Sequence, residues 1–206
     1  TIRVYGPPPA TIALRFAADN AQAFPKDVDA VIVNVAGCGS MLKDYGHVAD
    51  ELDCDRIMQD KLTALAGKVR DVSEFLAELG PIPPTGEIRL KATYHDACHL
   101  AHAQKVRDQP RALLALIPGL ELIPLPESDI CCGAAGSYNL TEPEMADRLA
   151  RRKVANVMKT GAEAVITGNA GCALQLQAAL RAAGESVRVV HPMDLLDLSY
   201  RNLQPP

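Results

Sequence analysis

The segment Ala164-Val165-Ile166-Thr167-Gly168-Asn169-Ala170-Gly171-Cys172 decides how this chain is organised, because an earlier segment repeats it. At a constant offset of 134 positions, and without a gap, it matches Ala30-Val31-Ile32-Val33-Asn34-Val35-Ala36-Gly37-Cys38 at six positions. A chance match in an Ala- and Val-rich chain is the alternative, but a stretch with helical spacing precedes both segments. The repetition predicts one and a half copies of a single structural unit.

The later copy alternates between predicted strands and helices. We expect strands at 88–94, 120–125, 164–168 and 187–190, a helix within 100–117, and helices at 142–160, 173–183 and from 192 onward. Thr141 is the predicted N-cap of the second of these helices. The earlier part shows a helix ending at Pro25, a strand at 30–33 and mostly helix from 41 to 80, after an extended lead-in at 1–10. This order predicts an α/β fold whose parallel sheets are joined by helical crossovers.

Prolines and glycines mark a boundary between the copies. The run Gly80-Pro81-Ile82-Pro83-Pro84-Thr85-Gly86 breaks regular structure. We therefore expect residues 1–80 to be the C-terminal part of a first domain, 81–86 a linker, and 87–206 a complete second domain. The first residue is Thr, so we expect the missing part of the first copy to precede Thr1 in a longer polypeptide.

Charge and hydropathy exclude several classes of partner and location. The net charge is −4 and no long basic run occurs, which argues against nucleic acid and anionic membranes as direct partners. No apolar stretch approaches the 18 or so residues of a spanning helix, and the start lacks a signal-peptide pattern. A cytoplasmic location is predicted, and in that reducing compartment the six cysteines favour metal binding or redox chemistry over structural disulfides.

The neighbouring cysteines Cys131 and Cys132, which are followed by Gly133, are not expected to form a disulfide with each other. Neighbouring Cα atoms lie about 3.8 Å apart, below the roughly 4.4 Å minimum of an ordinary disulfide. A metal or cluster, redox exchange with distant cysteines, or simple core packing remain as its roles.

Parallel-sheet geometry brings further cysteines towards the doublet. Cys98, the doublet and Cys172 each follow a predicted strand, and the carboxyl ends of parallel strands share one edge of the sheet. Four convergent thiolates favour zinc or an iron-sulfur cluster. Gly133 and Gly171 would let the backbone approach such a cofactor.

Other candidate ligands are less well placed. His95, His99 and His191 could join the site as ligands or second-sphere donors, or serve only packing. Cys54 fits no ligand spacing and is expected to be a bystander. Cys38, the counterpart of Cys172, would serve a second site.

The cysteine pattern resembles the CCG domain family of cysteine-rich domains, which occurs in heterodisulfide reductase and in several partners of flavoenzymes. The pattern is Cys98, then Cys131-Cys132-Gly133, then Cys172. The segments 36–46 and 94–105 look most like iron-sulfur subunits of glycolate oxidase. One departure is Asn169, which stands where the family's C-x-x-C has its first cysteine, and this speaks against a five-cysteine, non-cubane cluster.

The resemblance implies an electron-transfer role. The chain would hold a four-thiolate iron-sulfur cluster of the 4Fe-4S kind and pass electrons from an FAD-containing glycolate oxidase subunit onward, towards a quinone reached through the complex. Two alternatives remain open: a zinc-stapled scaffold that docks a flavoprotein, and a thiol-disulfide oxidoreductase like heterodisulfide reductase.

Overall fold

Four strands, β3 (Leu90–Tyr94), β4 (Leu120–Ile123), β5 (Ala164–Ile166) and β6 (Arg188–Val190), form one parallel sheet in the order β4-β3-β5-β6. The computed structural model describes residues 9–52 and 54–205. All three residues of β5 are buried. This is typical of a central strand in a parallel sheet that is covered on both faces.

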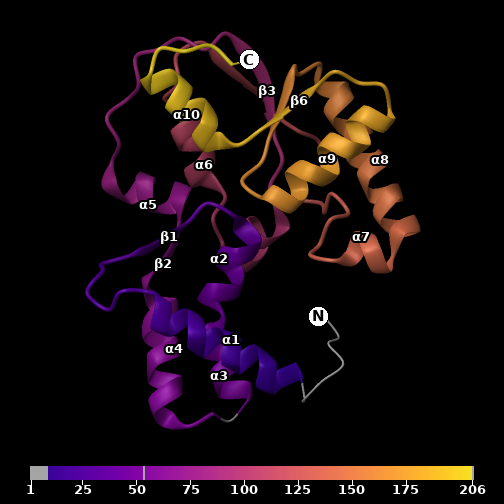
Figure 1. Ribbon diagram of the computed structural model, residues 1–206. Coiled ribbons are helices and arrows are strands. Elements are labelled where there is room, and N and C mark those ends of the chain that lie inside the picture. The colour runs from indigo at the N-terminus through magenta and orange to yellow at the C-terminus, as the bar shows by residue number, and fades with distance from the viewer. Residues whose placement is uncertain (1–8, 53, 206) are drawn as a thin grey trace.

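Helices cover the two faces of this sheet (Figure 1). On one face, α8 (Pro143–Thr160) and α9 (Ala170–Ala182) pack against Val165 of β5 through Val157 and Leu176. On the other face, α6 (Asp108–Leu114) and α10 (Pro192–Tyr200) pack against Ile166. The result is the three-layered α/β arrangement that the alternation predicts, which confirms the predicted fold class.

The first part of the chain has a smaller parallel sheet of two strands, β1 (Val31–Val33) and β2 (Val69–Asp71). Its helices are α1 (Pro9–Ala23), α2 (Ala36–Lys43), α3 (Tyr45–Glu51), α4 (Arg56–Lys68) and α5 (Val72–Leu79). Leu62 of α4 and Val69 of β2 are fully buried in a core of its own.

The two parts share an order of matching elements, although α3 and α4 have no counterpart between α9 and β6. Strand β1 runs into α2 as β5 runs into α9, and both helices begin at the alanine of the repeated Ala-Gly-Cys. The residues before these alanines, Val35 and Asn169, both have extended backbones. Strand β2 then pairs with β1 as β6 pairs with β5, and α5 and α10 follow. The repeat found in the sequence is therefore a repeat of structure.

Several predicted boundaries are wrong. Helix α9 begins at Ala170 and not at 173, so Cys172 lies in its first turn. The helix predicted within 100–117 is present as α6, but it ends at Leu114, before Pro118, and a π-helix, η1 (His99–Ala103), precedes it. Helix α8 has Glu142 at its N-cap, because Thr141 closes the short helix α7 (Tyr138–Thr141) instead.

The N-terminal lead-in is also shorter than expected. Helix α1 begins at Pro9, so the extended lead-in is wrong at residues 9 and 10; proline is well suited to a first helical turn. The rest of that lead-in lies outside the described residues.

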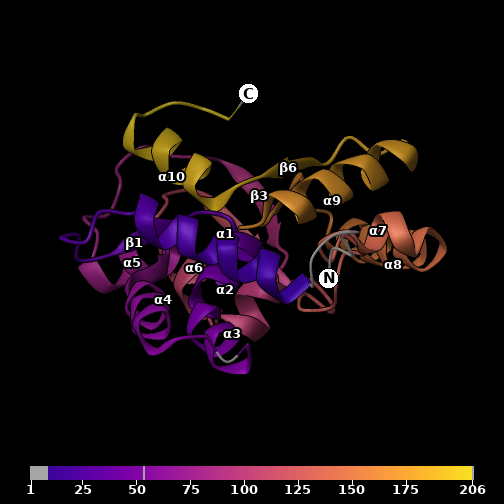
Figure 2. The ribbon, with the colours of Figure 1, turned by 60° about the horizontal axis from the view of Figure 1, so that its bottom comes forward.

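The two parts pack directly on one another, since α5 contacts α6 and α2 contacts η1. Figures 1 and 2 show the first part, with α2 and α5, against the second. The backbone N–H of Ala36 donates to the carbonyl of Gly168 over 3.1 Å. Gln104, which follows η1, donates to the carbonyl of Ala36 over 2.9 Å. The first turn of α2 is thus held against the end of β5. Across residues 9–52 and 54–205, none of the helices combines the length and apolar content that crossing a membrane requires.

Candidate metal centre

Three loops at the carboxyl edge of the larger sheet carry the predicted ligands. Cys98 follows β3 and immediately precedes η1, the doublet Cys131-Cys132 follows β4, and Cys172 lies in the first turn of α9 after β5. π-Helices are rare in proteins, but those that do occur are often found at functional sites. The convergence expected from the parallel topology is therefore present in the structure.

The thiols of the four cysteines influence one another's pKa. Cys98 interacts with Cys131, Cys131 with Cys132, and Cys132 with Cys172, whose sulfur lies within 4.8 Å of that of Cys132. Cys132 and Cys172 are buried, whereas Cys98 and Cys131 are partly exposed. All four are free cysteines. The site therefore has a dry inner half and an accessible outer half.

Their mutual contacts split the pKa values of the four thiols. Hydrogen bonds from Cys132 and Cys98 lower the pKa of Cys131 to about 2. The pKa of Cys172 falls to about 5, because hydrogen bonds from Cys132 and Asn169 outweigh burial. Hydrogen bonding to Cys131, together with burial, raises the pKa of both Cys98 and Cys132. These shifts favour the thiolate form of Cys131 and Cys172, and thiolate is the form that binds a soft metal.

His95 joins the inner half of the site. Its ligand nitrogen and the sulfurs of Cys132 and Cys172 all lie within 4.8 Å of one another. The Nδ1 atom lies 3.1 Å from the carbonyl oxygen of Ser128, which can only accept, so Nδ1 carries the proton. In the neutral ring Nε2 is then left with a free lone pair, and this atom is buried without a hydrogen-bond partner in the described part of the chain.

This orphaned nitrogen provides a test of fit for a metal. A buried polar atom without a partner costs about 1–3 kcal/mol, so native proteins rarely retain one without a use. A soft cation bound by the sulfurs would supply the missing partner, and a carbonyl that fixes the histidine tautomer is the usual second-sphere contact of a metal-binding imidazole. The residues present therefore fit a metal or an iron-sulfur cluster.

A buried cation supports the loop before the doublet. Lys153 of α8 is 2% exposed, and its Nζ donates to the carbonyls of Glu127 and Ser128. Burial lowers its pKa, while the nearby Cys132 opposes that shift. The lysine both fixes the loop and places positive charge near the thiolates, which sequence reasoning missed because Lys153 lies within an ordinary helical pattern.

An ion pair supports the loop of Cys98. Arg111 donates to both carboxylate oxygens of Asp96 and lies over the ring of Tyr94, with its guanidinium carbon 4.7 Å from the ring centroid. The backbone N–H of Asp96 also donates to the carbonyl of Ser128. These contacts tie the segment between β3 and η1 to the loop before the doublet.

The glycines of the site have different local roles. A Cβ at Gly133 would lie 2.4 Å from the carbonyl oxygen of Ala146, and its φ of 95° is in the region that favours glycine. Gly133 thus lets the doublet pack closely on α8. At Gly171 a Cβ would make only ordinary contacts with Asn169 and Ala134. Their approach to a cofactor remains a prediction.

The other candidate residues differ in their surroundings. Cys38 is exposed in the first turn of α2. His191 caps its own helix by accepting from the N–H of Met193, and its Nε2 lies 3.0 Å from the carbonyl oxygen of Asn34, so its contacts are structural. His99 lies beside Cys98, with Nδ1 3.5 Å from the sulfur. Cys54 packs against the core of the first part.

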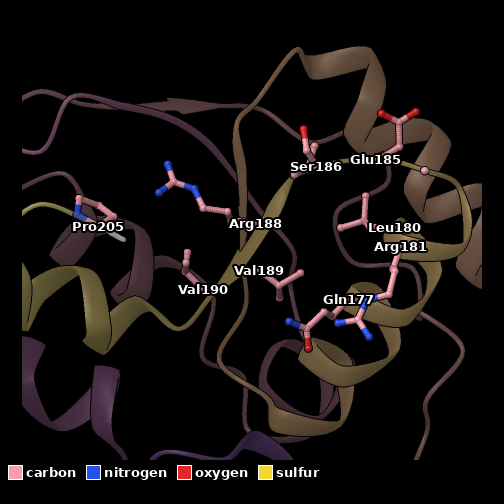
Figure 3. A pocket seen from close by; sticks show the side chains of 11 residues that line it. Gln177, Leu180, Arg181, Glu185, Ser186, Arg188, Val189, Val190 and Pro205 are labelled. Carbon is pink, nitrogen blue, oxygen red and sulfur yellow. The ribbon is translucent and has the colours of Figure 1, made fainter.

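A cavity of about 540 Å³ lies away from this centre (Figure 3). It is bordered by the C-terminal end of α9, including Leu180 and Arg181, and by β6 with Pro205. Cys172 is at the opposite end of α9, a helix of 13 residues and so about 20 Å long. The cavity is therefore separate from the candidate metal centre.

Known proteins are similar to most of this chain. The family model of the CCG cysteine-rich domain matches residues 92–177. The chain is 38% identical over 174 residues to the "Probable glycolate oxidase iron-sulfur subunit" of Bacillus subtilis, covering 82% of this chain and 38% of that protein. It is 34% identical to one subunit of the fumarate reductase (CoM/CoB) of Methanothermobacter marburgensis, covering 84% of this chain and 32% of that protein.

A third relative is closer in length. "Lactate utilization protein A" of Geobacillus kaustophilus is 28% identical, with 83% of this chain and 71% of that protein covered. The chain thus spans about a third of the first two relatives. Among solved structures, a glutamate racemase of Francisella tularensis aligns at 16% identity with a TM-score of 0.37, which is too low to support any argument. The segment that matches the family model of the CCG cysteine-rich domain, residues 92–177, thus contains all four of the converging cysteines, and the chain is similar to that family there.

Proposed function

We propose that the chain is the iron-sulfur, electron-transfer part of an oxidoreductase that acts on a 2-hydroxy acid such as glycolate. The observation that carries this proposal is the gathering of Cys132, Cys172 and a ring nitrogen of His95 within 4.8 Å of one another, at the sheet edge that Cys98 and Cys131 also reach. The relatives named as subunits of a glycolate oxidase and a fumarate reductase support a redox role.

In this proposal the four cysteines hold a cluster, of the 4Fe-4S kind where four thiolates are the ligands. When bound, such a cluster would accept and release one electron at a time. The chain's own residues would form the surroundings of this cluster. Lys153 provides a buried positive charge, and His95 provides a fixed dipole or a ligand. Burial of Cys132 and Cys172 excludes water from the inner half of the site. The more exposed Cys98 and Cys131 lie on the side where electrons would enter or leave.

The partners follow from this role. An FAD-containing subunit would oxidise the hydroxy acid, and this chain would pass the electrons onward, towards a quinone reached through the complex. A cytoplasmic location is part of the proposal. We also propose that residues 1–80 form the C-terminal part of a first CCG domain whose second site includes Cys38, with 81–86 as linker and 87–206 as the second domain.

One observation favours a different function for the same site. A nitrogen and two sulfurs within 4.8 Å of one another come close to the spacing of about 3.7 Å that ligands have around a single tetrahedral zinc ion. A zinc ion here would staple three loops of a scaffold that docks a flavoprotein, and it would carry no electrons. The third alternative, a thiol-disulfide oxidoreductase, would require no metal.

Anaerobic purification followed by iron, sulfide and zinc analysis and by EPR distinguishes these functions. Electron transfer requires iron and acid-labile sulfide in similar amounts and an EPR signal that appears on reduction or oxidation. About one zinc per chain without iron would refute the electron-transfer function and support the scaffold. A metal-free chain with accessible thiols would leave only the oxidoreductase alternative.

A further inference from the structure

The side chain of Asn169 joins the candidate metal centre to the first part of the chain. Its Nδ2 lies 3.3 Å from the sulfur of Cys172, and its Oδ1 lies 3.1 Å from the backbone nitrogen of Gly37. Asn169 is 9% exposed. Its two hydrogen bonds therefore form a short and largely dry connection between the two copies of the repeat.

The orientation of this amide is determined by its partners. The N–H of Gly37 can only donate, so the amide oxygen must face it. The NH₂ group is consequently directed at the sulfur of Cys172, which must accept. Asn169 thus fixes the direction of the Cys172 sulfur.

The hydrogen bond from the Gly37 N–H to the side chain of Asn169 acts as an N-terminal cap of α2. Val35, at the N-cap of α2, has no side chain that can accept a hydrogen bond, so the first N–H groups of that helix need partners from elsewhere. The carbonyl of Gly168 takes the N–H of Ala36, and Asn169 takes that of Gly37. Asn169 is itself the N-cap residue of α9, yet its side chain makes no cap bond there. It caps the neighbouring copy's helix.

We propose that Asn169 is a positioning residue that couples the metal centre of the second copy to α2 of the first. A metal bound by Cys172 fixes the sulfur, the sulfur fixes the Asn169 amide, and the amide holds the first turn of α2, on which Cys38 lies. Hydrogen bonds in such a chain polarise and strengthen one another. The inference rests on the proposed metal site at Cys172, but it does not depend on whether that site takes iron-sulfur or zinc.

Coupling of this kind is reciprocal. If metal binding stabilises the first turn of α2, then an ordered first turn of α2 raises metal affinity by the same factor. A residue that served packing alone would change the stability of α2 without making it depend on the metal. Metal-dependent protection of α2 is therefore the property that distinguishes the two roles.

Amide hydrogen exchange of the Gly37 N–H, with and without Co²⁺, tests the proposal in the full 206-residue chain. Co²⁺ is the probe because its thiolate absorption reports loading of the cysteines independently of the native metal. In the unchanged chain, loading should slow exchange of Gly37 by about fivefold or more, the lower range of measured couplings. In Asn169→Ala, exchange should be faster and should no longer respond to Co²⁺.

Two further variants complete the design. Asn169→Asp keeps an acceptor for Gly37 but loses the donor to Cys172, so it should stay folded, protect Gly37, and lose the response to Co²⁺. Asn139→Ala is the matched control, since Asn139 donates to Gln175 away from the bridge and should leave the response intact.

The outcomes separate this inference from the proposed function. An equal response to Co²⁺ in the unchanged chain and in Asn169→Asp would overturn the coupling, as would no response in the unchanged chain once its thiolate absorption shows loading. Failure of the chain to bind Co²⁺ through its cysteines would overturn it as well. Native zinc in place of iron would refute electron transfer, yet the Co²⁺ response would still establish the coupling.

Discussion

The guanidinium of Arg111 forms two hydrogen bonds, each 2.7 Å long, with the carboxylate of Asp96. The side chain of Asp96 is 6% exposed and that of Arg111 is 38% exposed. Asp96 lies between His95 and Cys98, two candidate groups of the metal centre. The pair therefore acts on the segment from which the outermost sulfur and the buried imidazole both extend.

Loss of this pair should destabilise the chain and loosen the metal centre. We expect Arg111→Met to lower the free energy of unfolding by about 2–3 kcal/mol, somewhat below the cost of breaking a fully buried pair because Arg111 is partly exposed. Urea denaturation of the metal-free chain measures this. Arg107→Met is a suitable control, since its pair with Asp129 is 3.8 Å long and exposed. Equal losses in both variants would contradict the prediction.

The same pair predicts a pH dependence. Burial tends to raise the pKa of Asp96, but hydrogen bonds from Arg111 and Ser128 and the charge of Arg111 outweigh it, so the pKa is lowered below 3.8. The ion pair therefore makes its full contribution to the free energy of unfolding at pH values above 3.8, the pKa of Asp96 in the unfolded chain. This contribution is lost as the pH falls through the lower pKa of Asp96 in the folded chain. Asp96→Asn should therefore flatten the loss of stability below about pH 4. Unfolding curves of both forms, measured at a series of pH values on either side of about pH 4, would show whether the slopes differ.

Lys153 should raise the reduction potential of a cluster bound beside it. Lys153→Met removes a buried positive charge near Cys132, so added electrons become less favourable. We expect the midpoint potential to fall by tens of millivolts, where about 59 mV corresponds to 1.4 kcal/mol for one electron. Lys153→Arg should retain most of the potential. Lys159→Met, further along the same helix, is the control, and a fall of the same size there would mean that only net charge matters.

The backbone at Gly133 should tolerate no side chain. In Gly133→Ala the new Cβ would meet the backbone carbonyl of Ala146 and would also be strained by the positive φ. We expect a loss of more than about 2 kcal/mol, since strain alone costs about 1–2 kcal/mol. Gly184→Ala has the strain but no close neighbour, and Gly67→Ala, within α4, has neither. Thermal denaturation should rank these variants with Gly133→Ala the least stable and Gly67→Ala the most stable.

His95 distinguishes the two kinds of metal site. If four cysteines hold a cluster, His95→Ala should leave the iron content near that of the unchanged chain and alter its EPR signal through the lost dipole. If a zinc ion is bound, the same variant removes a ligand and should lower zinc affinity by at least about tenfold, as even outer-sphere changes do. We expect the first result. Metal analysis after dialysis against a chelator decides between them.

The sequence predicted the fold because its two decisive signals are local. Alternating buried strands and helices imply a parallel sheet, and the matched segments around Cys38 and Cys172 imply a repeat, so the common edge for the cysteines follows from topology. Neither signal depends on side-chain detail. For this reason the order of residues alone was enough to predict the sheet and the convergence of the cysteines that follow its strands.

What the sequence could not predict depends on contacts between distant residues. The sequence marks Asn169 only as a missing cysteine, because nothing in it shows that Gly37 lies beside that residue. In the sequence, Lys153 resembles any lysine of an amphipathic helix. Only the structure shows that it donates to the carbonyls of the loop at 127–128. Ends of helices are also hard to predict. Thr141 ends α7 and does not cap α8, because its hydroxyl donates to the carbonyl of Tyr138.

Cys132 is the strongest single test of the ligand set. It is fully buried, and its sulfur lies within 4.8 Å of both the sulfur of Cys172 and a ring nitrogen of His95. Cys132→Ser replaces a soft sulfur with a hard oxygen of similar shape, so it should abolish the bound metal while the apoprotein stays folded. Cys54→Ser is the matched control, because Cys54 packs against the core of the first part, and its replacement should leave metal content unchanged. Metal analysis and far-UV circular dichroism of both variants provide the measurement; an unchanged metal content in folded Cys132→Ser would show that the doublet is core packing and that the ligands lie elsewhere.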